Sequence, residues 1–141
     1  MNEHDTVQKY LKERGCEDEV VASGLPGLIA EWERVAEEIG GEPYEFGLDD
    51  YLNDLDTRDI LHGALEAAGT DARAIRAAME AADEQFKAAT KSVKECLWGE
   101  SLARQHGWSA KKEWWYYRVP AESGADLEED LKAAGIKVSK P

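Results

Sequence analysis

Cysteine and histidine are scarce in this chain of 141 residues, which has only two cysteines, Cys16 and Cys96, and three histidines. Two cysteines cannot build a disulfide framework. No two histidines have the i, i+4 spacing of a helical zinc site, and no Cys-x-x-Cys motif is present. We therefore expect no bound metal and no cofactor.

Long apolar runs are missing as well. No stretch approaches the roughly 18 apolar residues that a membrane-spanning helix needs, and the first residues lack the positive charge and apolar core of a signal peptide. We therefore expect a cytoplasmic protein that does not associate with membranes. Phosphate-binding glycine loops and the Gly-x-Ser-x-Gly motif are also absent, so the sequence predicts no catalytic residue and makes an enzyme the less favoured class.

Positive charge is the third scarce feature. The chain has 17 Lys and Arg against 30 Asp and Glu, a formal net charge of −13. This charge disfavours nonspecific binding to nucleic acids or anionic membranes and favours a cationic partner. An apolar content of 43% with five Trp is typical of a globular protein, and the length fits one domain over residues 1–141.

Apolar periodicity predicts a mostly α fold, a compact bundle of five to seven helices with a small two-stranded β element near the C-terminus. A first helix is expected at 5–14, a break at Ser23-Gly24, two helices at 48–55 and 57–68, and the longest helix at 71–97. Asp56 and Ser123 are expected to cap helices. Gly135 and Ile136 predict a Schellman ending for the last helix.

The densest acidic segment, 49–59, has five Asp residues. It lacks the central Gly and the final Glu of a calcium-binding loop, and Arg58 occupies one would-be ligand position. On a helix, Asp50 and Asp54 share the face opposite the leucines. This pattern predicts an ordinary solvated helix face, and a partner-binding surface is the alternative.

Aromatic residues are concentrated in one short basic stretch. Six of the twelve Trp, Tyr and Phe residues lie between 98 and 117. Residues 87–120 contain seven Lys and Arg against three Glu, whereas residues 1–86 contain seven against 22 Asp and Glu. Segment 113–119 is predicted to be a strand, with 136–138 as a parallel neighbour in a small crossover.

In a strand, side chains alternate between two faces. Trp115 and Tyr117 are then predicted to be buried. The opposite face combines two cations with two amphipathic aromatic rings and is the predicted binding site; its members are Lys112, Trp114, Tyr116 and Arg118. In the alternative, these four residues have a structural role: the two cations pair with carboxylates of the acidic residues 1–86, and the two rings pack on a helix.

Two classes of function follow from these features. The first is a non-catalytic protein-interaction module, of the inhibitor or immunity type, that holds a basic protein partner. The second is a small-molecule-binding domain or small enzyme whose pocket lies between the helices of 48–68 and the strand at 114–118. In that pocket Trp114, Tyr116 and Arg118 would orient an anionic ligand. The oligomeric state is not predicted.

Overall fold

The computed structural model describes residues 3–41, 43–69 and 72–137 of the chain. Within them it confirms a mostly α fold with a small two-stranded sheet near the C-terminus. The elements in chain order are α1 (Glu3–Glu13), α2 (Asp18–Gly41), α3 (Leu48–Ala68), α4 (Arg73–Ala88), β1 (Thr90–Ser92), α5 (Glu100–His106), the 3-10 helix η2 (Trp114–Tyr117), β2 (Arg118–Pro120) and α6 (Ala125–Ala133).

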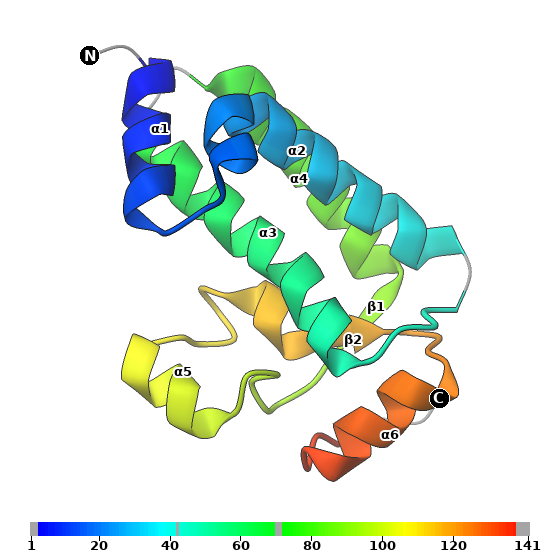
Figure 1. The fold of residues 1–141 in the computed structure, drawn as a ribbon. Coiled ribbons are helices and arrows are strands. Elements are labelled where there is room, and N and C mark those ends of the chain that lie inside the picture. The colour runs from blue at the N-terminus through cyan, green and yellow to red at the C-terminus, as the bar shows by residue number, and fades with distance from the viewer. Residues whose placement is uncertain (1–2, 42, 70–71, 138–141) are drawn as a thin grey trace.

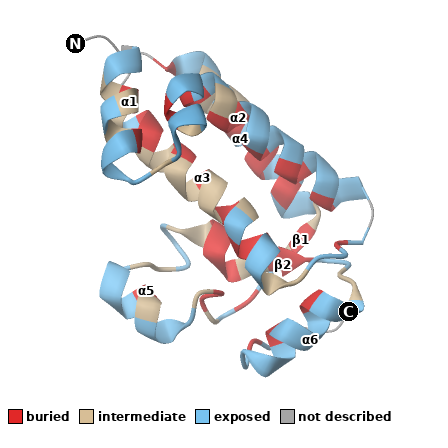
Figure 2. Ribbon diagram, in the orientation of Figure 1, coloured by how far each residue is buried: buried red, intermediate tan, exposed pale blue. Residues whose placement is uncertain are grey.

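Four helices form the larger part of the molecule (Figure 1). Helix α2 packs against α4, and both α1 and α2 pack against α3. The C-terminal elements α5, η2, β2 and α6 lie at the end of the bundle where α4 leads into β1 (Figure 1). Buried residues follow the inward faces of the helices and the segment around β1 and β2 (Figure 2). None of the described helices is both long and apolar enough to cross a membrane.

Glycines shape the helix ends where the sequence predicts breaks. Gly24 has φ 59° and ψ −147°, which kinks α2 at the predicted break. At the end of α6, Ile136 N–H donates to the Leu131 carbonyl at 3.0 Å, and Gly135 N–H donates to the Lys132 carbonyl at 3.1 Å. These two bonds form the predicted Schellman ending. The first helix is also confirmed, as α1.

The prediction of one long helix at 71–97 is wrong at its C-terminal end; its first predicted residue, at 71, lies outside the described residues. Helix α4 ends at Ala88, and the Thr90 hydroxyl donates to the Phe86 carbonyl at 2.9 Å. Apolar residues beyond this point are still buried, because the amide hydrogens of Val93 and Leu97 bond to carbonyls of η2. In this segment, the apolar residues at helical spacing are buried although the backbone is not helical.

The predicted strand at 113–119 is also wrong for most of its length. Residues 114–117 form η2, and only the residues from Arg118 onward are extended. Strand β2 pairs with β1 antiparallel, with Thr90 opposite Pro120 and Ser92 opposite Arg118. The predicted parallel partner is not used, because the Ile136 amide belongs to the end of α6; residue 138 lies outside the described residues. An aromatic run indicates burial more directly than it indicates a strand.

Two predicted helix caps are wrong. Helix α3 continues without interruption through Asp56, so the two helices predicted at 48–55 and 57–68 are one. Helix α6 begins after Gly124 without a side-chain cap, and Ser123 instead forms an isolated bridge with Tyr44. Both residues are used for contacts between distant segments.

The contact of α1 with α3 depends on Gly63, and we predict that Gly63→Ala lowers the free energy of unfolding by about 1–3 kcal/mol. A Cβ there would lie 1.8 Å from the Tyr10 hydroxyl oxygen, which also accepts a hydrogen bond from Arg14. Urea denaturation measures the loss. Gly40→Ala is the control, since its Cβ would meet only Ala89 Cβ at 3.9 Å. An equal loss in both variants would contradict the prediction.

Candidate functional site

The four residues predicted to form one binding face do not share a face, because η2 replaces the expected strand. Lys112 is exposed, and Trp114 and Arg118 are half-buried. Tyr116 is only 1% exposed, as deeply buried as Trp115. Trp115 and Tyr117 are buried as predicted.

The side chains of Tyr116 and Arg118 bond to other parts of the chain itself. The Tyr116 hydroxyl donates to Asp56 Oδ1 at 2.8 Å. Arg118 Nε donates to Thr90 Oγ1 at 2.8 Å, and its Nη2 donates to the carbonyls of Thr90 at 3.0 Å and Lys87 at 3.2 Å. Tyr116 therefore bonds to a carboxylate of the acidic part of the chain, residues 1–86. Arg118 instead bonds to uncharged oxygens and links α4 to β2.

The Asp56 carboxylate is half-buried between α3 and η2. Burial raises its pKa above the ordinary value, and the hydrogen bond from Tyr116 opposes that rise. A raised pKa means that the folded chain holds this proton more tightly than the unfolded chain. The contribution of Asp56 to stability is therefore present below its unfolded pKa of about 3.9 and falls as the pH rises through the folded pKa.

We expect this linkage to appear in the pH dependence of unfolding. The stability of the wild type relative to Asp56→Asn should fall as the pH rises above about 4. Urea denaturation of both proteins between about pH 4 and pH 7 measures the difference. Lys112→Ala, which changes no carboxyl group, should run parallel to the wild type. If the stability of the wild type relative to Asp56→Asn rose with pH, the assignment would be contradicted.

Beneath segment 113–119, which we call the aromatic segment, lies a charged pair that the sequence did not reveal. Arg58 of α3 and Asp83 of α4 are 4% and 7% exposed. Arg58 Nε donates to Asp83 Oδ1 at 2.8 Å, and its Nη2 donates to Oδ2 at 3.0 Å. Trp32 of α2 also donates to Asp83 Oδ1, at 2.9 Å. One carboxylate thus joins three helices.

Aromatic rings of η2 cover this pair. Arg58 Cζ lies 4.5 Å from the ring centroid of Trp115 and 5.5 Å from that of Trp114. Arg58 therefore makes cation–π contacts with both rings. The missed signal is positional, because Arg58 interrupts the apolar stripe of α3 midway between Leu55 and Leu61. Asp83 likewise occupies a stripe position of α4, four residues after Met79 and three before Phe86.

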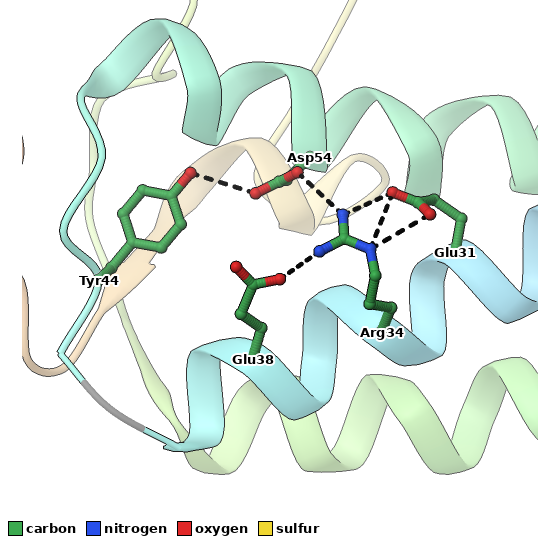
Figure 3. Close-up of polar contacts among 5 residues, drawn as sticks. All are labelled: Glu31, Arg34, Glu38, Tyr44 and Asp54. Carbon is green, nitrogen blue, oxygen red and sulfur yellow. Dashed lines mark hydrogen bonds and ion pairs between the residues drawn. The ribbon is translucent and has the colours of Figure 1, made fainter.

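A second group of polar contacts lies at the surface where α2 meets the start of α3 (Figure 3). Arg34 Nη2 is 2.5 Å from Glu31 Oε1 and 3.7 Å from Asp54 Oδ1, and its Nη1 donates to Glu38. The Tyr44 hydroxyl donates to the other oxygen of Asp54 at 3.1 Å. Three carboxylates therefore surround one guanidinium, which leaves a formal charge of −2 when all are ionised.

Two residues of this group, Glu38 and Tyr44, also line a hollow beside the loop that precedes α3. It is lined by Glu38, Pro43, Tyr44, Glu45 and Phe46, and we call it the acidic hollow. Its volume is about 140 Å³. The phenyl ring of Phe46 packs edge-on against Tyr44, with ring centroids 5.6 Å apart. Its side chain is nevertheless 53% exposed, the only large apolar residue so exposed among those described.

The loop that carries the acidic hollow is hydrogen-bonded to segment 122–124 through both backbone groups of Tyr44. Tyr44 N–H donates to the Glu122 carbonyl at 3.1 Å, and Gly124 N–H donates to the Tyr44 carbonyl at 2.6 Å. Burial raises the pKa of the Asp54 carboxyl, whereas the hydrogen bond from Tyr44 lowers it. The hydrogen bonds from Arg34 lower the pKa of Glu31. The exposed Phe46 ring is therefore held by an anchored backbone beside fixed negative charges.

The acidic segment 49–59 is only partly the solvated face that its sequence predicts. Asp50 is exposed, but Asp54, Asp56 and Asp59 are half-buried. Asp59 forms an ion pair with Arg14 at 2.7 Å. Among the described residues, no group of three or more Asp, Glu, His and Cys side chains is arranged to hold a metal ion. The segment supplies tertiary contacts as well as surface charge.

Comparison of the chain with models of known protein families, with curated protein sequences and with solved structures finds no match.

Proposed function

We propose that the chain is a non-catalytic binding protein that holds a basic protein partner at the acidic hollow. The observation that carries this proposal is the exposed phenyl ring of Phe46, which lines the acidic hollow together with Glu38 and Glu45. Glu38 also belongs to the group of carboxylates around Arg34 (Figure 3). Aromatic residues, Phe among them, are enriched in the cores of protein interfaces, where a few anchor residues dominate the binding energy. The net charge of −13 favours a cationic partner.

The size of the acidic hollow favours a macromolecular partner over a small ligand. Its volume of about 140 Å³ is well below the roughly 300–1,000 Å³ of small-molecule sites. A hollow of this size suits a single side chain of a partner, and the acidic rim would attract a lysine or arginine. Glu38 of the hollow shares Arg34 with Glu31 and Asp54, so the hollow and the neighbouring carboxylates together still carry excess negative charge after this pairing.

The affinity for the partner tests this proposal. We predict that Phe46→Ala weakens this affinity by about 30-fold or more, which is the loss expected for an anchor worth roughly 2 kcal/mol. Proteins captured on the immobilised chain at low salt are identified, and the dissociation constant of the purified complex is measured by calorimetry. Because Phe46 is exposed, the free energy of unfolding should stay within about 0.5 kcal/mol of the wild type.

Two further results decide whether the complex is the proposed one. Affinity should fall as salt is raised, because screening weakens attraction between exposed charges. Phe46→Leu should retain more affinity than Phe46→Ala, since it keeps an apolar side chain in the same place. A complex that is insensitive to both salt and Phe46 would contradict the proposal.

A further inference from the structure

Three side chains that carry N–H groups meet where α3 contacts η2, away from the acidic hollow. Arg58 and His62 are four residues apart on α3, so they project from the same side of the helix. The Trp115 ring touches both, with its centroid 4.5 Å from Arg58 Cζ and 5.7 Å from the His62 ring centroid. A guanidinium, an imidazole and an indole therefore converge.

Two of these groups have buried N–H donors to spare. Arg58 Nε and Nη2 bond to Asp83, but Arg58 Nη1 has no hydrogen-bond partner among the described residues. Trp115 Nε1 is likewise buried and without an acceptor within the described chain. Arg58 is 4% exposed and Trp115 is 1% exposed. Each buried donor without an acceptor costs about 1–3 kcal/mol, so an acceptor that reached both donors would relieve this cost.

We propose that this junction of Arg58, His62 and Trp115 binds a small carboxylate group. One carboxylate oxygen accepts from Arg58 Nη1 and the other from Trp115 Nε1, which matches two donors on two side chains. Asp83 already balances the charge of Arg58, and Glu66 lies 3.1 Å from His62 Nε2, so every negative charge added here is costly. A singly charged carboxylate therefore costs less than a doubly charged phosphate.

His62 is the most exposed member of this junction. Its side chain is 44% exposed, so it forms the solvent edge of the junction, while Arg58 and Trp115 form the buried wall. The sequence predicted an anionic ligand between the helices of 48–68 and the aromatic segment, held by Trp114, Tyr116 and Arg118. The geometry points to the same junction with other residues, and this proposal is independent of the acidic hollow.

Acetate is the probe that tests the site, and the indole N–H resonances of the intact protein are the readout. In ¹⁵N-labelled protein, the Trp115 Nε1–H resonance should shift saturably with acetate, in the millimolar range. The Trp32 indole should not shift, because it already donates to Asp83. Absence of a saturable shift at Trp115, or an equal shift with chloride or with acetamide, would overturn the proposal.

A variant supplies the second test. Trp115→Phe keeps an aromatic ring over Arg58 and removes only the indole donor, so acetate should bind about threefold to tenfold more weakly, as followed at the Arg58 Nε–H resonance. Unchanged affinity would overturn the role of Trp115. If the variant does not fold, the wild-type titration with its Trp32 control still decides.

Discussion

Arg58→Ala is expected to lower the free energy of unfolding by about 3–5 kcal/mol, because it leaves the carboxylate of Asp83 buried without its counterion. Asp83 is 7% exposed and would keep only the hydrogen bond from Trp32. Domains of this size are stable by roughly 5–15 kcal/mol, so the loss removes a large share of the total. Chemical denaturation followed by tryptophan fluorescence measures it.

The matched control replaces both partners by apolar residues of similar size. The double variant Arg58→Met with Asp83→Leu should be much closer to the wild type, because no buried charge is left unpaired. The Trp32 indole loses its acceptor in this variant, so a residual loss of about 1–3 kcal/mol is expected. A double variant as unstable as Arg58→Ala would show that packing around Arg58, and not the ion pair, sets the cost.

Tyr116→Ala is expected to cost a similar amount, about 3–5 kcal/mol, the range for truncating a large buried aromatic side chain. Its ring is 1% exposed and packs against Trp108, with ring centroids 4.7 Å apart. Truncation also removes the donor to Asp56. Thermal or urea unfolding measures the loss.

Two further variants separate the contribution of the buried ring to stability from that of the hydroxyl group and from that of an exposed neighbour. Tyr116→Phe removes only the hydroxyl and should cost about 1–3 kcal/mol, since the half-buried Asp56 loses its donor. Lys112→Ala changes an exposed side chain and should stay within about 0.5 kcal/mol of the wild type. If Tyr116→Ala were as stable as Lys112→Ala, the ring would not be part of the core.

The helical part of the fold was predictable because its signals are local. The apolar stripe that includes Trp32, Val35 and Ile39 repeats at helical spacing, and glycines mark the ends and the kink of α2. The C-terminal half depends on pairing between distant segments. Neither the end of α4 at Ala88 nor the pairing of β1 with β2 is written in the spacing of residues around them.

The candidate sites were less predictable for a related reason. The sequence directs attention to the aromatic segment, yet alternation in a strand assigned Tyr116 to the wrong side because the backbone turns as a 3-10 helix. Arg58 and Asp83 carry a readable signal, a charge at an apolar stripe position, but the two residues are 25 positions apart and lie on different helices. The exposure of Phe46 depends on how its loop is fastened to residues 122–124, which no local pattern reports.

The affinity of the purified basic partner for two charge-changed variants tests the proposed function most directly. Glu38→Lys reverses a charge at the acidic hollow, and Lys112→Glu reverses one beside the aromatic segment; both side chains are exposed. We predict that Glu38→Lys weakens the complex by at least about tenfold, while Lys112→Glu leaves it unchanged or slightly stronger. Loss of binding in Lys112→Glu with full binding in Glu38→Lys would place the partner on the aromatic segment and contradict the proposal.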